Sequence, residues 1–335
     1  MLQVEDLRTH FFTRSGVVRA VDGVSFTVRE RETLGIVGES GSGKSMTALS
    51  ILRMVPAPAG KIVGGRVLLR GDDLLAKSER EIRKIRGSRI SMILQDPMTS
   101  LDPLFTIGDQ LAEPIRIHQR EGTTSVSARV EEMLRLVKIP APESRMKDYP
   151  HQMSGGMRQR IVGAIALACR PELLIADEPT TSLDVTIQAQ FLALLKEVQR
   201  ELGLAMIVIT HDFGIVARLC HRVAVMYAGR IVEEADVRTL FRSPAHPYTA
   251  ALLRSLPQLG RESERLCSIG GQPPDLRCLP PGCSFAPRCS KTIDVCRSEY
   301  PAPRDLGDGH HVCCHVATTG CGTTRRKRPS CRSRS

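Results

Sequence analysis

The sequence predicts an α/β fold in which helices flank a parallel sheet, followed by a small cysteine-bearing C-terminal unit. Three short, continuous apolar runs have the composition of buried parallel strands, namely Thr33–Val37, Leu173–Ala176 and Met206–Thr210. Helix-like stretches such as Ser127–Val137 and Ile187–Glu201 lie between and beside them. Strands that alternate with helices indicate a parallel sheet covered by helices.

The chain divides by composition into three units. Residues 1–240 carry the strand and helix pattern, and a polar, mostly helical stretch at about 97–157 predicts an inserted helical subdomain. Prolines become dense from Ser243 on, which predicts an irregular C-terminal unit over residues 241–318. Residues 319–335 carry basic side chains and no acid, so we expect a disordered basic tail.

The net charge of +11 does not by itself indicate a nucleic-acid-binding protein. Much of the surplus lies in the short basic tail, which is expected to be solvated, with at most a weak attraction to anionic lipid head groups. The sequence has no run of about 18 apolar residues and its N-terminus has no apolar signal core. We therefore expect a cytoplasmic protein without a specific nucleic-acid partner, held at a membrane only through other subunits.

A phosphate-binding loop (Walker A) follows the first apolar strand. It reads Gly-Glu-Ser-Gly-Ser-Gly-Lys-Ser and leads into a helix predicted over Met46–Met54. The glycines let successive N–H groups face the phosphates, and the helix N-terminus adds the positive end of its dipole. We expect Lys44 to reach the β- and γ-phosphates of ATP and the Ser45 hydroxyl to ligate Mg²⁺. The candidate residues of this loop are Gly38, Glu39, Ser40, Gly41, Ser42, Gly43, Lys44, Ser45 and Met46.

Two acids follow the strand Leu173–Ala176. The strand places Asp177 at the carboxyl edge of the sheet, where open α/β sheets bind their ligands. We expect Asp177 to hold Mg²⁺, directly or through water, and Glu178 to polarise the attacking water as a general base. Adjacent acids are common where a loop follows a strand, so the pair indicates a nucleotide site only together with the phosphate-binding loop.

A further motif resembles the signature loop of the ABC ATPases. It reads Met153-Ser154-Gly155-Gly156-Met157, where the family usually has Leu-Ser-Gly-Gly-Gln. The resemblance implies a P-loop NTPase cassette with a mixed sheet, in which Ser154, Gly155 and Gly156 face the γ-phosphate of the nucleotide held by the opposing subunit. Met157 in place of Gln removes one polar side chain, which is expected to alter the rate but not to abolish activity.

Four more positions match ABC ATPase motifs in the family's order along the chain. Gln95 matches the Q-loop residue, which the resemblance implies senses Mg²⁺ and water and contacts the transmembrane partner. Asp184 matches the D-loop, and His211 matches the switch histidine that contacts the γ-phosphate. Phe11 matches the aromatic side chain that stacks on adenine; a core position is the alternative for Phe11, and Phe12 is a weaker substitute.

Three segments resemble the ATPases of oligopeptide and dipeptide importers, namely Gln95–Pro103, Asp184–Gln190 and His246–Thr249. The resemblance implies a peripheral subunit on the cytoplasmic face of the membrane. Its implied partners are an identical or homologous second ATPase, two transmembrane permeases and, indirectly, a peptide-binding protein. Nickel importer ATPases share part of these sequence motifs and are the alternative, and a soluble NTPase acting on nucleic acid is less favoured. The roughly 110 residues between Ser45 and Ser154 carry no sustained heptads, which excludes the coiled-coil DNA-repair ATPases.

Nine of the eleven cysteines lie after residue 266. Cys283, Cys289, Cys296 and Cys314 resemble the pattern at the end of the peptide importer ATPases, which in some members is associated with a [4Fe–4S] cluster. Four thiolates are what such a cluster requires, whereas structural zinc usually has a closer pair of cysteines. Cys313 adjoins Cys314, and the sequence leaves open which of them would ligate. A cluster, zinc and reduced thiols remain three interpretations, of which the resemblance favours the cluster.

Overall fold

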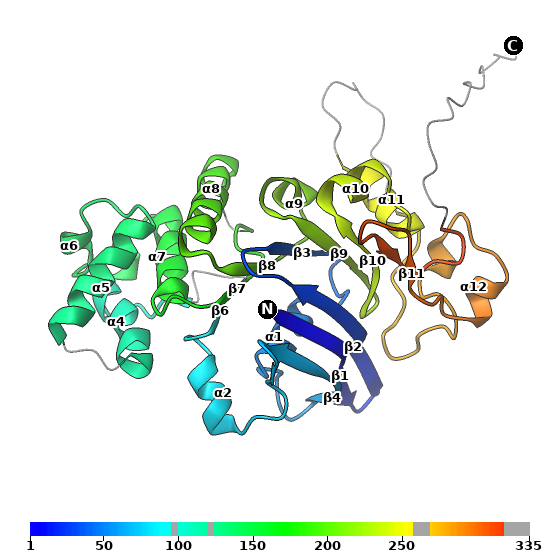
Figure 1. Cartoon of the computed structure of the whole chain (residues 1–335), viewed down its shortest axis with the longest axis horizontal. Helices are drawn as coiled ribbons and strands as arrows, with labels where there is room; N and C mark the ends of the chain where they lie inside the picture. The colour runs from blue at the N-terminus through cyan, green and yellow to red at the C-terminus, as the bar shows by residue number, and fades with distance from the viewer. Residues whose placement is uncertain (95–99, 120–122, 182, 257–268, 318–335) are drawn as a thin grey trace, which may run out of the picture.

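The computed structural model describes residues 1–94, 100–119, 123–181, 183–256 and 269–317. Its strands belong to two sheets, one of eight strands and one of four (Figure 1). The strands are β1 (Leu2–Thr13), β2 (Gly16–Val28), β3 (Thr33–Val37), β4 (Gly60–Leu69), β5 (Asp72–Asp73), β6 (Ile90–Ile93), β7 (Leu173–Asp177), β8 (Ala205–Thr210), β9 (Arg222–Tyr227), β10 (Arg230–Asp236), β11 (Arg304–Asp305) and β12 (His311–Val312).

The larger sheet has the order β11-β12-β10-β9-β3-β8-β7-β6. The neighbouring strands from β9 to β6 run parallel, which confirms the predicted parallel sheet. β10, β12 and β11 are added antiparallel at one edge, so the sheet as a whole is mixed. The smaller sheet, β2-β1-β4-β5, is antiparallel and contains the N-terminus.

Helices cover the larger sheet and form a group at one end of the molecule, where α4 to α7 lie together (Figure 1). The helices are α1 (Lys44–Ile51), α2 (Glu79–Ile85), α4 (Ile107–His118), α5 (Thr123–Leu136), α6 (Pro142–Arg145), α7 (Gly155–Leu167), α8 (Val185–Leu202), α9 (Phe213–Leu219), α10 (Val237–Arg242), α11 (Pro247–Arg254) and α12 (Val295–Ser298), with 3-10 turns η1 (Pro150–Gln152) and η2 (Ala286–Arg288).

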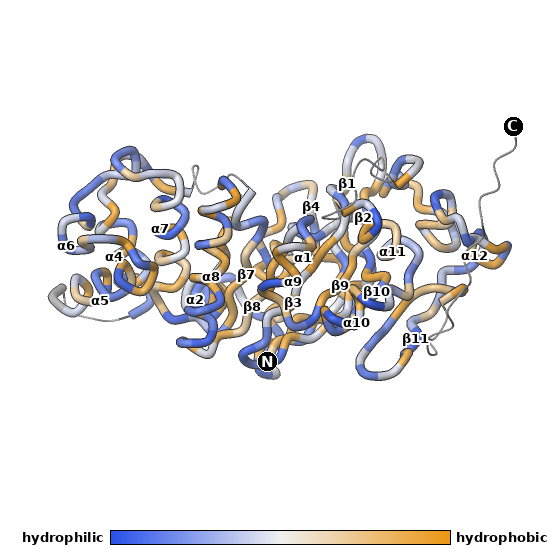
Figure 2. Tube along the Cα trace, turned by 90° about the horizontal axis from the view of Figure 1, so that it is seen from above, coloured by the Kyte–Doolittle hydropathy of each residue, from blue (hydrophilic) through white to orange (hydrophobic). Residues whose placement is uncertain are grey.

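The central strands are apolar throughout because both faces of the sheet are covered. Along β8, the side chains of Met206 and Val208 join the core formed with α4, α5, α7 and α8. Those of Ile207 and Ile209 join the core formed with α1 and the smaller sheet. Hydrophobic stretches along β7, β8, β3 and β9 accordingly run through the middle of the molecule (Figure 2).

The C-terminal segment, residues 241–317, is joined to the larger sheet. Strand β12 pairs with β10 and β11 pairs with β12, so the segment supplies the last two strands of one edge. The buried Glu233 of β10 accepts hydrogen bonds from the backbone N–H groups of Ala245 and His246 at 2.7 and 2.9 Å. Its carboxylate also lies 2.8 Å from His310 Nε2. These contacts fix the segment against the unit that carries the phosphate-binding loop.

Within the described residues, none of the helices combines the length and the apolar character needed to cross a membrane.

Candidate nucleotide-binding site

The phosphate-binding loop connects β3 to α1. Gly43, directly before α1, has a φ of +102°, a conformation that side chains disfavour. A Cβ atom built on Gly43 would lie 2.3 Å from the carbonyl oxygen of Ala20, so the position has no room for a side chain. The loop therefore needs glycine here for two independent reasons.

Replacing Gly43 by alanine is expected to lower the free energy of unfolding by about 2 kcal/mol and to weaken Mg-ATP binding, because the loop must shift. Chemical denaturation and equilibrium nucleotide binding would measure both effects. Gly41→Ala is a matched control: Gly41 also has a positive φ, of +76°, but a Cβ there meets nothing within 4 Å. Equal losses in the two variants would contradict the steric explanation.

The side chain of Lys44 lies inside this loop. Its Nζ donates hydrogen bonds to the carbonyl oxygens of Gly38 at 2.8 Å and Glu39 at 3.0 Å. Burial lowers the pKa of Lys44, while the carboxylates of Glu178 and Asp177 act in the opposite direction and favour the charged form. The loop thus holds an ammonium group in a nearly buried position close to two acids.

Ser45 and Asp177 face each other although they lie far apart in the sequence. The Ser45 hydroxyl donates a hydrogen bond of 3.1 Å to Asp177 Oδ1. Asp177 ends β7 and is 4% exposed, and burial raises its pKa. A hydroxyl and a carboxylate at this separation provide the hard oxygen ligands that Mg²⁺ prefers, so the pair fits the predicted ion.

Glu178 and His211 follow the neighbouring strands β7 and β8. The Glu178 carboxylate lies 3.2 Å from His211 Nδ1 and accepts a hydrogen bond of 3.0 Å from the Thr181 hydroxyl. Burial raises the pKa of Glu178, but the hydrogen bonds from His211 and Thr181 outweigh it and hold the pKa below its usual value. Glu178 is therefore ionised at neutral pH and able to accept a proton.

The predicted signature loop and Asp184 begin two neighbouring helices. Ser154 caps α7 and accepts a hydrogen bond of 3.3 Å from the Met157 N–H. Asp184 caps α8 by accepting two hydrogen bonds of 3.0 Å. A Cβ atom on Gly156 would lie 2.8 Å from Ile187, so the two helix starts touch. Among the described residues, no hydrogen bond links these helix starts to the phosphate-binding loop of the same chain.

Comparison with known proteins identifies the family. Residues 21–181 match the ABC transporter family model, and residues 232–296 match the oligopeptide/dipeptide transporter C-terminal region. Over 316 residues, 94% of each chain, the protein is 55% identical to the probable peptide ABC transporter ATP-binding protein y4tR of Sinorhizobium fredii. It is 51% identical over 314 residues, again 94% of each chain, to the dipeptide transport ATP-binding protein DppD of Bacillus subtilis. The chain belongs to the ATP-binding subunits of the oligopeptide/dipeptide ABC transporters.

A solved ABC cassette has the same fold. The ATP-binding cassette MJ0796, solved as a dimer in a post-hydrolysis state bound to ADP and Pi, superimposes with a TM-score of 0.63 and 28% identity. It covers 71% of this chain and 99% of its own. The predicted fold class, an ABC cassette with a mixed sheet, is thereby confirmed, and as an ABC ATPase the chain binds ATP together with Mg²⁺.

Two predicted cassette residues remain, Phe11 and Gln95. Phe11 is half-buried near the end of β1, where a Cβ atom on Gly60 would lie 2.9 Å from its ring. Strand β1 is tied to α1 by the hydroxyls of Thr9 and Ser50, 2.7 Å apart. The prediction for Gln95 falls outside the residues that the structure describes.

Met157, which replaces the usual Gln of the signature, is partly buried. Its side chain packs against the core of the helical group. The exchange therefore contributes apolar contact at the start of α7, which the sequence alone did not indicate.

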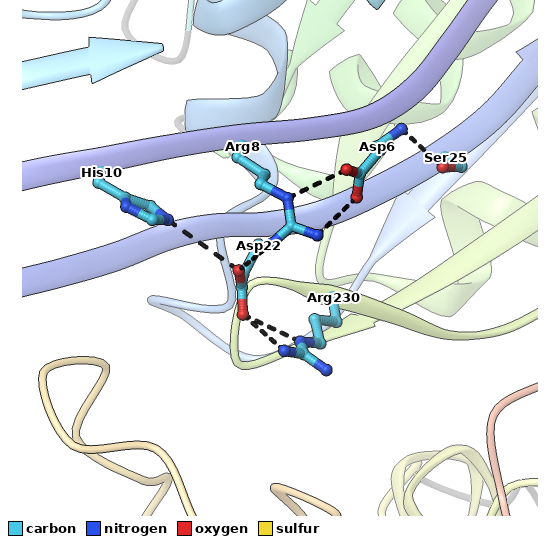
Figure 3. A network of polar contacts seen from close by, with 6 residues as sticks. All are labelled: Asp6, Arg8, His10, Asp22, Ser25 and Arg230. Atoms are coloured by element: carbon cyan, nitrogen blue, oxygen red, sulfur yellow. Dashed lines mark hydrogen bonds and ion pairs between the residues drawn. The ribbon is translucent and has the colours of Figure 1, made fainter. Parts of the chain in front are cut away.

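A network of ion pairs that the sequence did not predict joins residues of β1, β2 and β10 (Figure 3). At its centre is the side chain of Asp22, which is 2% exposed. It accepts hydrogen bonds from Arg230 at 2.7 and 3.1 Å and from Arg8 at 3.3 Å, and it lies 4.0 Å from His10. Burial raises the pKa of Asp22, but the two arginines outweigh it and keep the pKa low.

Asp22→Asn is expected to lower the free energy of unfolding at pH 7 by about 1–3 kcal/mol, because Arg230 loses its charged partner. A carboxyl whose pKa is lowered by folding stabilises above its unfolded pKa of about 4, and this contribution is lost as the pH falls through the folded value. The difference between variant and wild type should therefore shrink in acid. Urea unfolding at several pH values tests this, with the more exposed Asp6→Asn, paired with the same Arg8, as control. A cost no larger than that of the control would contradict it.

The four predicted cluster ligands all lie in the C-terminal segment as free cysteines. The Cys283 N–H donates a hydrogen bond of 2.8 Å to the Cys296 carbonyl. Burial raises the pKa of Cys283, and charge on Cys296 and Cys314 would raise it further. Among the described side chains, however, no group of three or more His, Cys, Asp or Glu residues is placed to hold a metal ion. The four described cysteines are therefore not arranged as a metal-binding site.

Two residues of the C-terminal segment contact the phosphate-binding loop and were not foreseen. Tyr248 and Arg288 both reach Glu39, the second residue of the loop. Tyr248 belongs to the His-Pro-Tyr-Thr segment that resembles the importer ATPases, but nothing in the sequence indicates what it contacts.

Proposed function

We propose that the chain is the ATP-hydrolysing subunit that powers the import of di- and oligopeptides through an ABC transporter. The observation that carries the proposal is the meeting of five polar side chains beyond the carboxyl ends of three adjacent strands, β3, β8 and β7. Ser45 contacts Asp177, and Glu178 contacts His211, while the Lys44 ammonium lies close to both acids. Such an arrangement provides a cation for the phosphates, ligands for Mg²⁺ and an ionised base.

In the proposed mechanism Lys44 neutralises charge on the β- and γ-phosphates, and the loop amides from Gly38 to Met46 orient the triphosphate. Ser45 and Asp177 would hold Mg²⁺, with Gln95 as the further predicted ligand, and the ion would supply charge neutralisation at the phosphates. A water attacks the γ-phosphorus and gives its proton to Glu178, while the bond to the oxygen bridging the β- and γ-phosphates breaks and ADP leaves. His211, hydrogen-bonded to Glu178, orients the base and contacts the γ-phosphate.

We also propose that the site is completed by a second cassette. Ser154 and Gly155 lie exposed at the start of α7, where the N–H groups of a helix terminus can face an anion. Asp184 lies beside them through the contact of Gly156 with Ile187. These residues would close over the nucleotide of the partner cassette, whether that cassette is identical or homologous, so that hydrolysis needs a pair of subunits. Phe11 is the proposed adenine contact.

The proposed assembly adds two transmembrane permeases and, indirectly, a peptide-binding protein, with this chain at the cytoplasmic face of the membrane. The similarity of the chain to proteins named for peptide and dipeptide transport supports this assembly. Reconstitution of the chain with its permeases and second ATPase tests it. We expect a dipeptide, presented with the binding protein, to stimulate ATP hydrolysis and to enter the vesicles. Stimulation by Ni²⁺ instead of peptides would establish the nickel importer alternative.

For the C-terminal cysteines, a [4Fe–4S] cluster held by Cys283, Cys289, Cys296 and Cys314 stays a prediction that rests on the family resemblance. No step of hydrolysis depends on it. Anaerobically purified protein tests it directly, since iron and acid-labile sulfide in equal amounts would support the cluster. Zinc alone, or neither metal, would rule it out.

A further inference from the structure

The C-terminal segment holds one residue of the phosphate-binding loop from outside. Arg288 donates to both carboxylate oxygens of Glu39, at 2.7 Å from Nη1 and 3.0 Å from Nη2. The backbone N–H of Glu39 donates a hydrogen bond of 2.9 Å to the Tyr248 hydroxyl. The side chain and the amide of Glu39 are therefore both engaged by residues more than two hundred positions away.

The side chain of Arg288 is also held by contacts outside the phosphate-binding loop. Its side chain is 4% exposed and also donates to the carbonyl oxygen of Gly270 at 3.0 Å and to the Tyr227 hydroxyl at 3.3 Å. A planar guanidinium with its donors occupied in this way holds a carboxylate in one orientation, because both N–H···O bonds must be kept. The pair with Glu39 thus sets the direction in which the Glu39 side chain points.

Tyr248 is fixed by an aromatic cluster. It is fully buried, and its ring lies 4.6 Å from that of Tyr227 and 5.3 Å from that of Phe285, measured between centroids. Its own N–H donates to His246 Nδ1 at 3.0 Å, which caps the start of α11. The position of the Tyr248 hydroxyl is therefore determined by tight packing and not by the loop that it contacts.

Glu39 needs such restraint because it is an acid in a loop that binds an anion. Its carbonyl oxygen lies 3.0 Å from Lys44 Nζ, and its carboxylate is close enough to favour the charged form of Lys44. Without a partner, the Glu39 carboxylate would repel the triphosphate and compete with it for the Lys44 ammonium. A bidentate arginine neutralises this charge and holds the carboxylate in one place.

We propose that Arg288 and Tyr248 are positioning residues of the nucleotide site, which hold Glu39 so that the loop accepts ATP. The C-terminal segment is then a structural part of the nucleotide site, and its His-Pro-Tyr-Thr segment acts on the loop through the Tyr248 hydroxyl. The inference rests on the proposed ATPase function and assigns the regulation of ATP affinity to contacts outside the cassette motifs.

The test compares Arg288→Gln with the double variant Glu39→Gln/Arg288→Gln in the full-length chain and in the reconstituted transporter. Arg288→Gln leaves an unpaired acid in the loop, so we expect the Kd and KM for Mg-ATP to rise about 10-fold, with kcat changed less than about 2-fold. The double variant removes the acid as well and is expected to recover most of the affinity. Arg288→Lys, which keeps the charge but not the fork, should lie between wild type and Arg288→Gln.

Arg277→Gln is the matched control, since Arg277 forms an exposed pair with Asp275 in the same segment. It should leave KM and kcat unchanged. Tyr248→Phe removes one hydroxyl and is expected to raise the Kd about 5-fold, by the loss of one hydrogen bond to the loop. Thermal unfolding of each variant shows whether the fold is kept.

The outcomes separate the two proposals. A wild-type chain that binds no Mg-ATP would overturn the proposed function itself. A wild type that binds, with Arg288→Gln unchanged in affinity, would overturn the positioning role. The positioning role would also be overturned if Arg288→Gln lowers the affinity for Mg-ATP and the double variant does not recover it. If Arg288 only stabilised the fold, its removal would lower the affinity whether or not the charge of Glu39 were present.

Discussion

Glu178→Gln is expected to abolish steady-state ATP hydrolysis while Mg-ATP binding is retained. The exchange keeps the shape of the side chain, and an amide can still hydrogen-bond to His211 and Thr181. It removes the carboxylate that would accept the proton of the attacking water, and a general base contributes roughly 10²- to 10⁴-fold to a rate. Phosphate release by the reconstituted transporter should therefore fall by at least about 100-fold. Equilibrium binding of Mg-ATP should stay within about 2-fold of wild type, since the phosphate contacts are untouched.

Glu172→Gln is the control for this variant. Glu172 directly precedes the same strand, β7, at its other end, where it pairs with Arg70 and Arg89 on the surface. The same chemical exchange there should leave turnover within about 2-fold of wild type. Undiminished phosphate release by Glu178→Gln would contradict the assignment of Glu178 as the general base, whatever the control shows.

Lys44→Ala is expected to weaken Mg-ATP binding by about 100-fold or more. Hydrogen bonds that involve a charged group contribute about 1.5–3 kcal/mol each, and Lys44 is the cation that the loop itself directs toward the phosphates. Its removal also leaves the carbonyl oxygens of Gly38 and Glu39 without the donor that they share. Titration with a fluorescent ATP analogue in the presence of Mg²⁺ measures the Kd.

Lys138→Ala provides the comparison for Lys44→Ala, because Lys138 forms an exposed pair with Glu197 in the helical part of the molecule. Its Kd for Mg-ATP should equal that of wild type. An affinity of Lys44→Ala within about 3-fold of wild type would mean that the loop amides alone hold the phosphates, contrary to the mechanism proposed here.

The elements that the sequence predicted are those with a local signal. The strand Thr33–Val37 was predicted with the bounds that β3 has, and Leu173–Ala176 and Met206–Thr210 each differ from β7 and β8 by one residue. A continuous apolar run between turn residues has few alternatives in a sheet covered on both faces. The ends of helices are predicted less accurately. The sequence predicts a helix over Met46–Met54, whereas α1 spans Lys44–Ile51, because the loop glycines and the cap decide where the helix begins.

Other features had no local signal. Strands β11 and β12 contain two residues each, too few for any periodicity, and they exist because β10 offers an edge for pairing. The buried Asp22 network likewise brings together three strands from both sheets. Its members are ordinary charged residues in the sequence, and only burial makes their pairing significant.

A strand, a phosphate-binding loop and a helix in succession can be predicted from the sequence, because glycine spacing and apolar periodicity act over a few residues. Which distant groups meet that loop follows only from the fold. It placed Asp177 against Ser45, and Arg288 and Tyr248 against Glu39. Such contacts depend on how the strands are ordered in the sheet and how the C-terminal segment folds back on it. They are encoded by the packing of the whole chain and not by any short stretch of it.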